Sequence, residues 1–210
     1  MATVKGPLFS IAASGTVGGA IVYSTWKGRA YVRQHAVPAN PKSVGQLSVR
    51  AMLQFLSQYW ATLSSVQQAT WEARAAVTNI SPFNAFMQYN LVRWGTEAVP
   101  GMTDPAEAGD VAGVIDNGNL TQGSRSLLIE VEVTTLNQNW GILIYRDPAA
   151  DLAGTRNEMV HVIPAVAAEV FTWLDSPLTP GTTYYYRARS FSEDGLAGNL
   201  LGEWHGVPDA

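Results

Sequence analysis

The stretch LTPGTTYYYRAR, residues 178–189, is the most informative part of this sequence. It places a Pro-Gly turn, Pro180-Gly181, directly before a run in which Tyr184, Tyr186 and Ala188 share one side of an extended chain. Residues 126–136, SLLIEVEVTTL, alternate between apolar and polar side chains in the same way. Further short runs at 140–146, 159–163 and 168–174 are each bounded by Pro, Gly, Asn or Asp. This pattern predicts an all-β, antiparallel C-terminal half.

The order of Leu178, the Pro-Gly turn and Tyr184 closely resembles the corner that precedes strand F in fibronectin type III domains. The resemblance covers residues 105–208 and implies a fibronectin type III or Ig-like β-sandwich over residues 109–210. It gives Tyr184 the role of a corner tyrosine, with Pro180 and Gly181 forming the turn before it. It also places Trp140 at the start of strand C as a core aromatic. These four residues are therefore expected to be structural.

Charge is distributed unevenly along the chain. Residues 1–100 hold eight Lys or Arg against two acids, Glu72 and Glu97, whereas residues 101–210 hold five Arg against fifteen Asp or Glu. Such asymmetry indicates two modules that face different surroundings. Residues 96–110, TEAVPGMTDPAEAGD, contain two Pro and two Gly without an apolar period. We therefore expect a module over residues 1–98, a linker over 99–108 and the sandwich over 109–210.

A β-hairpin is predicted near the N-terminus, because two strand-like runs, 20–26 and 29–34, flank the two-residue connection Lys27-Gly28. The register expected from this turn pairs Trp26 with Arg29, Ser24 with Tyr31 and Val22 with Arg33. One face then holds arginines within reach of aromatic rings, a candidate partner-binding surface: Trp26, Lys27, Arg29, Tyr31 and Arg33. The opposite face is the expected core face: Ile21, Tyr23, Ala30 and Val32. The alternative for the first face is a solvated surface stabilised by cation–π contacts.

Three short helices are expected after the hairpin. Ser43 and Gln46 fit a capping box ahead of an apolar stripe at helical spacing. A Ser with Gln three residues later opens the second helix, at residue 64 or 65, and Ser81-Pro82 opens the third. The N-terminal half is therefore predicted to be an α+β module, a β-hairpin region plus three short helices.

This N-terminal module resembles uncharacterised tailed-bacteriophage and prophage structural proteins over residues 6–95. Four strings carry the resemblance: WKGRxYVR at 26–33, NP at 40–41 with Gln46 and Arg50, WxxLSxxQxxxW at 60–71, and FNAF at 83–86 with Asn90. The resemblance implies a virion or morphogenesis protein that contacts other virion proteins, of the capsid or the tail. Because virions repeat their proteins, a homo-oligomer or symmetric array is expected.

Residues that carry enzymatic chemistry are missing or dispersed. The chain has no Cys, which excludes thiol chemistry, Fe–S clusters and cysteinyl zinc sites. His35, His161 and His205 are too scattered in sequence to suggest a metal site. Glu130 and Glu132 have a spacing of about 7 Å that suits a glycosidase pair, but alternating acids on a strand are more simply a solvated face. The sequence therefore predicts no enzyme and no cofactor. No membrane association is expected, since no run approaches about 18 apolar residues.

The sequence favours a non-enzymatic structural protein located in a tailed-phage virion. In the leading hypothesis it is an accessory protein, of the decoration or cement type, that docks on the capsid exterior by the N-terminal module and displays the sandwich. The alternatives are a neck, tail or baseplate component, and a nucleic-acid-binding protein packaged with the genome. The acidic C-terminal half disfavours the last, because DNA would repel it. A further hypothesis, that the chain is a carbohydrate-binding adhesin, is supported only by the sandwich fold.

Overall fold

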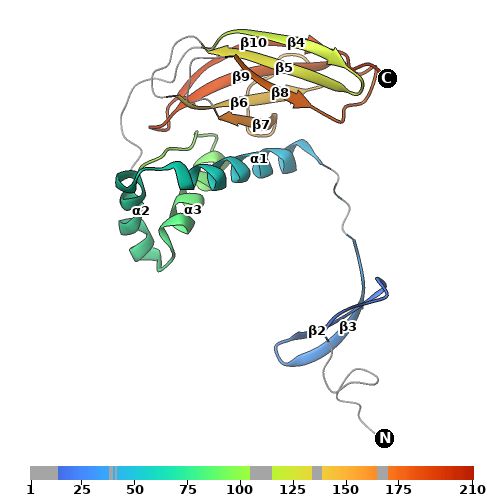
Figure 1. The fold of residues 1–210 in the computed structure, drawn as a ribbon, viewed down its shortest axis with the longest axis vertical. Coiled ribbons are helices and arrows are strands. Elements are labelled where there is room, and N and C mark those ends of the chain that lie inside the picture. The colour runs from blue at the N-terminus through green and yellow to red at the C-terminus, as the bar shows by residue number, and fades with distance from the viewer. Residues whose placement is uncertain (1–13, 38–39, 41, 105–114, 134–138, 165–169) are drawn as a thin grey trace, which may run out of the picture. The chain divides into compact units, whose positions relative to one another are not determined.

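The computed structural model describes residues 14–37, 40, 42–104, 115–133, 139–164 and 170–210 (Figure 1). The chain forms two compact units, Met1–Pro41 and Lys42–Ala210. The structure therefore divides the chain before the helices, not at the expected linker over 99–108, and the three helices belong with the sandwich. We call residues 14–37 the arm and the second unit the body.

The arm is a three-stranded antiparallel sheet in the order β1-β2-β3. Its strands are β1 (Gly15–Val17), β2 (Ile21–Trp26) and β3 (Arg29–Gln34). The register of β2 and β3 is the expected one, in which Trp26 pairs with Arg29 and Ser24 with Tyr31. Lys27 and Gly28 have φ angles of 48° and 76°, and a two-residue type I′ turn requires a positive φ at both positions. The hairpin prediction is confirmed.

Both faces of the arm are open. The face expected to form a core is not buried, since Ile21 is 41% exposed and Val32 is 54% exposed. On the other face, Trp26 is 66% exposed. The physical reason is size, because a few short strands cannot cover their own apolar side chains. The arm thus has the apolar content of a packed sheet but no core of its own.

The C-terminal part of the body is a β-sandwich of two antiparallel sheets (Figure 1). One sheet has the strand order β10-β9-β6-β7 and the other has the order β4-β5-β8. The strands are β4 (Ile115–Gly123), β5 (Ser126–Val133), β6 (Asn139–Asp147), β7 (Met159–Pro164), β8 (Val170–Asp175), β9 (Tyr184–Ser192) and β10 (Ala197–Gly206). Ile129, Ile144 and Tyr186 are among the buried residues of the core between the sheets. This is a fibronectin type III-like sandwich, and the predicted fold class is confirmed.

Three helices precede the sandwich: α1 (Val44–Tyr59), α2 (Ser65–Thr78) and α3 (Pro82–Gly95), with a short 3-10 turn, η1 (Trp60–Thr62), after α1. Ser64 and Gln67 form a capping box at the start of α2, and Ser81 caps α3 ahead of Pro82. Ser43 occupies the N-cap of α1, but its side chain makes no capping hydrogen bond, so the capping box expected there does not form. None of the helices in the described residues is long and apolar enough to cross a membrane.

The helices pack on the outer face of the four-stranded sheet and share a core with it (Figure 1). Trp140 on β6 is fully buried, and its ring centroid lies 4.9 Å from that of Phe55 on α1. Trp140 is thus a core aromatic, but its core lies between the sheet and the helices rather than between the two sheets. A register irregularity at the start of β6 turns its side chain away from that of Ile142, which lies between the sheets.

The first residues of the expected linker are held against the helices. Met102 is buried, and its carbonyl accepts a hydrogen bond of 2.8 Å from Trp71 Nε1. The Asn90 side chain bonds both backbone groups of Gly101, at 3.1 Å to the carbonyl and 2.9 Å from the N–H. The Met102 N–H donates to the carbonyl of Glu193 in the β9–β10 loop, at 2.8 Å. Pro100 and Gly101 are therefore buried in the body instead of forming a flexible linker. Residues 105–108 lie outside the described residues.

Candidate functional site

The arm brings the residues expected to bind a partner onto one face. Cross-strand pairing of β2 and β3 places Trp26, Arg29, Tyr31 and Arg33 on that face, with Lys27 in the turn beside them. The Lys27 ammonium lies 4.9 Å from the Trp26 ring centroid, a cation–π contact. An open hollow of about 560 Å³ lies beside Trp26, Arg29 and Tyr31. Because the hollow is wide and uncovered, it suits a protein surface better than an enclosed small molecule.

The charge of the arm and its N-terminal extension is of one sign. Residues 1–41 contain Lys5, Lys27, Arg29 and Arg33 and no Asp or Glu. Residues 42–210 contain nine Lys or Arg and seventeen Asp or Glu. The two units therefore carry opposite net charges, although the helical residues 42–100 of the second unit still hold four Lys or Arg against two acids. A basic surface without acids of its own favours an acidic partner.

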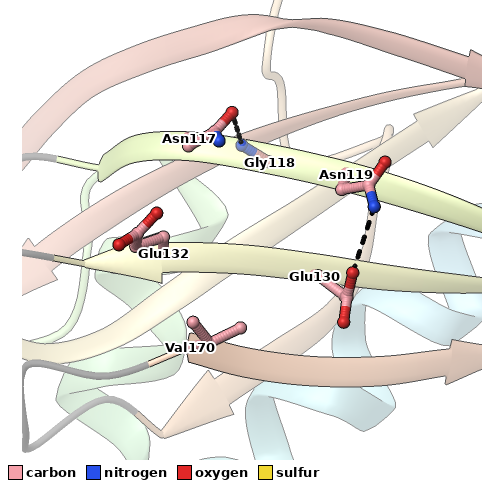
Figure 2. A pocket seen from close by; sticks show the side chains of 6 residues that line it. All are labelled: Asn117, Gly118, Asn119, Glu130, Glu132 and Val170. Carbon is pink, nitrogen blue, oxygen red and sulfur yellow. Dashed lines mark hydrogen bonds between the residues drawn. The ribbon is translucent and has the colours of Figure 1, made fainter.

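A second candidate surface lies on the outer side of the three-stranded sheet (Figure 2). Burial alternates along β5, so Glu130 and Glu132 point away from the core. Cross-strand neighbours on β4 and β8 complete this surface. We call it the acidic face, and it consists of Asn117, Asn119, Thr121, Leu128, Glu130, Glu132, Val170, Thr172 and Leu174. Its hollow of about 300 Å³ is lined by Asn117, Gly118, Asn119, Glu130, Glu132 and Val170.

The two carboxylates of the acidic face have few polar partners. Asn119 Nδ2 donates a hydrogen bond of 3.2 Å to Glu130 Oε2 (Figure 2). Among the described residues, no ion pair joins Glu130 or Glu132 to a basic side chain. The sequences of β4, β5 and β8 contain no Lys or Arg. Val170 and Leu174 on the same face are each 56% exposed. The acidic face is therefore suited to a cationic and partly apolar partner.

The geometry of Glu130 and Glu132 argues against their acting as a glycosidase pair. Such a pair needs one carboxyl group kept protonated by its surroundings while the other stays ionised. Both glutamates lie half-buried on one strand, in the same open hollow. This arrangement suits the binding of positive charge better than general acid catalysis.

A buried ionic cluster links the two sheets of the sandwich. Arg146 Nη1 on β6 lies 2.6 Å from Asp175 Oδ2 on β8. The Tyr186 hydroxyl on β9 donates to the same carboxylate oxygen at 2.8 Å. Burial and the nearby Asp175 carboxylate raise the pKa of Tyr186, which keeps the hydroxyl protonated as a donor. Because the three side chains satisfy one another where little solvent reaches them, the cluster has a structural role.

The corner before β9 has the contacts expected of a corner tyrosine. The Tyr184 hydroxyl accepts a hydrogen bond of 3.3 Å from the backbone N–H of Thr179. Gly181 has a φ of 74° directly after Pro180, as position i+2 of a type II turn requires. The Arg146 guanidinium lies over the Tyr184 ring, 5.5 Å from its centroid. These contacts shape the corner of the sandwich.

His161 lies where an edge strand of the four-stranded sheet, β7, meets an edge strand of the three-stranded sheet, β8. Its ring on β7 stacks on Trp173 of β8, with centroids 4.6 Å apart and planes 8° apart. Burial lowers the pKa of His161 to about 4, although the Asp175 carboxylate acts in the opposite direction. The ring is therefore neutral at physiological pH. In the part of the chain that the structure describes, no group of three or more His, Cys, Asp or Glu is placed to hold a metal ion.

Sequence alternation identifies the outward glutamates of the acidic face but not their neighbours. Asn119 and Val170 reach the hollow through strand pairing, which joins residues far apart in the chain. A usable signal is nevertheless present in the sequence, since the strand-like runs around Glu130 contain acids and no Lys or Arg.

The fold and its surfaces define a fibronectin type III-like sandwich with a helical layer on one sheet and a separate basic β-arm. The chain belongs to the Family of unknown function DUF6266, whose model matches residues 12–142. The matched stretch extends from the arm through the three helices into β6. No curated protein matches the chain in sequence.

Several solved structures are similar to about half of the chain. A β-1,2-glucanase from Parabacteroides distasonis is 14% identical with a TM-score of 0.37, covering 49% of this chain and 13% of the glucanase. The chicken CNTN1 FN1-FN3 domains are 17% identical with a TM-score of 0.37, covering 47% and 33%. The third fibronectin III domain of the human KIAA0343 protein is 15% identical with a TM-score of 0.32, covering 50% and 90%. This chain thus spans well under two thirds of the first two structures.

Proposed function

We propose that the chain is a non-enzymatic structural component of a tailed-phage virion, an accessory protein that docks on the capsid exterior by its arm and displays its body. The arm carries the proposal, because it is a separate basic unit with exposed aromatic and aliphatic side chains on its two faces. The virion location rests on the resemblance of residues 6–95 to phage structural proteins.

The energetics of the arm support docking. A two-stranded hairpin is at best marginally stable in water, and the arm adds only the three-residue strand β1 to its hairpin. Apolar surface that such a sheet buries on a partner favours binding, because it is removed from water. Trp26 and Tyr31 supply large, nearly rigid contact surfaces, and aromatic and Arg side chains dominate the binding energy of protein interfaces. A basic arm of this composition is suited to completing its packing on another protein.

The body is suited to display. It has two cores, one between the sheets and one between the four-stranded sheet and the helices. Neither core includes a residue of the arm. The body can therefore stay folded whether or not the arm is docked, which an exposed virion protein requires.

Binding to purified particles tests the proposal and separates its placements. The wild-type chain is mixed with emptied capsids or with isolated tails, and the fraction that sediments with each particle is measured. Saturable binding to capsids is the expected result. Binding to tails alone would favour the neck, tail or baseplate alternative, and binding to neither would contradict a virion role.

A nucleic-acid-binding protein packaged with the genome is the second candidate, and the charge of the arm favours it. Residues 1–41 contain basic side chains and no acids, and Trp26 and Tyr31 offer rings on which bases can stack. The acidic excess of residues 42–210 opposes it. A salt titration of DNA binding separates the two functions, because phosphate contacts give an affinity that falls steeply as salt rises.

A further inference from the structure

We propose that the acidic face is the docking site for the arm of a second copy of this chain. The inference rests on the proposed function in one respect, that the arm is a docking element. It adds a second partner for the arm, the sandwich of a neighbouring copy, so that arms not docked on the capsid join copies head to tail.

The two surfaces are complementary in charge. The arm offers Lys27, Arg29 and Arg33 and no acid. The acidic face offers Glu130 and Glu132 on strands without Lys or Arg. Juxtaposed like charges are penalised at interfaces, so contacts of arm with arm or of face with face are disfavoured. The charge pattern therefore selects the contact of an arm with a face.

The two surfaces also match in apolar character. Trp26 and Tyr31 lie next to the arginines on the arm, at 66% and 40% exposed. On the acidic face, Val170 pairs with Glu132, and the exposed Leu174 lies four residues further along β8 on the same face. A contact would cover aromatic rings with aliphatic side chains while guanidinium groups reach the carboxylates. Charge-assisted hydrogen bonds to carboxylates are among the strongest that Arg makes.

The size and symmetry of this contact predict a repeating assembly. A six-residue strand such as β2 or β3 spans about 20 Å, and three paired strands are about 14 Å wide, so one face of the arm covers at most about 280 Å². Each partner in a stable pair covers roughly 800 Å². One contact is therefore weak. Because an arm and a face are different surfaces, an open chain of copies keeps a free arm at one end and a free face at the other until a ring closes. A ring or array adds many weak contacts together, as a virion does.

Self-association of the purified full chain tests this inference without any particle, so its failure is distinct from a failure of virion binding. Wild-type association, followed by sedimentation velocity over a range of concentrations, should weaken as salt rises. One variant carries Arg29→Glu with Arg33→Glu, and another carries Glu130→Lys with Glu132→Lys. Each should weaken association by about tenfold or more, because each opposes like charges across the contact.

An equimolar mixture of the two reversed variants gives the sharpest result. In the mixture, acidic arms meet basic faces and basic arms meet acidic faces, so association should return toward the wild-type level. The matched control reverses two exposed acids outside the acidic face, Glu72→Lys with Asp209→Lys, and should associate like the wild type.

Introduced thiols give a second measurement, because the chain has no Cys. Ser24→Cys on the arm and Thr172→Cys on the acidic face, placed in separate copies, should form a disulfide-linked heterodimer when mixed, with dissolved oxygen as the oxidant that accepts the two electrons. Val77→Cys, on the exposed side of α2, should pair with Ser24→Cys far more slowly. A monomeric wild type at every concentration, unchanged association of the Glu130→Lys and Glu132→Lys variant, or no recovery in the mixture would overturn the inference.

Discussion

The ring of Phe55 on helix α1 lies 4.9 Å from the ring of Trp140 on strand β6, inside a core that the helices and the four-stranded sheet share. The two residues come from opposite sides of the stretch 96–110. Their contact is part of a larger set of stacked and edge-on aromatic pairs that includes Tyr59, Phe86 and Phe191. The helices and the sandwich are therefore expected to fold as one unit.

A fragment of residues 105–210 should not form a stable sandwich by itself. Without the helices it exposes Trp140, Leu143 and Phe191, which are fully buried in the body. Exposing each such side chain costs about 1.5–3 kcal/mol. A fragment of residues 42–210 should instead unfold in one cooperative transition, measured by circular dichroism in urea. Equal midpoints for the two fragments would show that the cores are independent.

Phe55→Ala should destabilise the sandwich although the residue lies on a helix. Removing a buried aromatic ring costs about 3–5 kcal/mol, because it loses transfer energy and leaves a cavity. The loss should appear in the β-sheet signal during urea unfolding. Val49→Ala, at a half-exposed position of the same helix, is the control and should change stability by less than about 1 kcal/mol. A sandwich transition that Phe55→Ala leaves unmoved would contradict the shared core.

Two tyrosines on β9 should differ in their contribution to stability. Tyr186→Phe removes a hydrogen bond to the buried Asp175 carboxylate and should cost about 1–3 kcal/mol. Tyr184→Phe removes a longer hydrogen bond from Thr179 at a half-buried site and should cost about 0.5–1.5 kcal/mol. Denaturant midpoints of the two variants measure the difference. The opposite order would mean that the corner, and not the ionic cluster, holds the sheets together.

Acid should destabilise the body through His161. The pKa of His161 is about 4 in the folded chain against an ordinary value of 6.5, so between these values the unfolded state binds more protons. Stability from this group is complete above about pH 6.5 and falls as the pH decreases toward about 4. Relative to His161→Phe, which keeps a ring against Trp173, the wild type should lose about 1–2 kcal/mol more between about pH 7 and about pH 5. Equal losses in urea denaturation would exclude His161 as the cause.

Local features of this fold can be predicted from the sequence because neighbouring residues determine them. Lys27-Gly28 sets the hairpin register, since a two-residue connection admits few backbone geometries. Ser81-Pro82 marks the start of α3, because the Ser81 side chain caps the first turn and Pro82 has no N–H that would be left unpaired there. The Pro180-Gly181 turn places Tyr184 at the start of β9.

The division of the chain depends on contacts between distant residues, and composition misleads there. Two Pro and two Gly in residues 96–110 are typical of a linker, but Asn90 holds Gly101 through two hydrogen bonds. One sequence signal does point to the helical layer. Residues 140–145, WGILIY, are apolar without alternation, which is the pattern of a strand buried on both faces. The pattern does not say which element covers the second face.

Docking through the arm is tested most directly by capsid binding of the Arg29→Glu and Arg33→Glu variant. The substitutions reverse the charge of one arm face and leave the body unchanged, so the folded variant should fail to sediment with particles that the wild type saturates. Lys42→Glu with Arg125→Glu, which reverses two exposed basic residues of the body, is the matched control and should bind like the wild type. Binding of the folded arm variant at wild-type occupancy would contradict the proposal and leave that face as solvated surface.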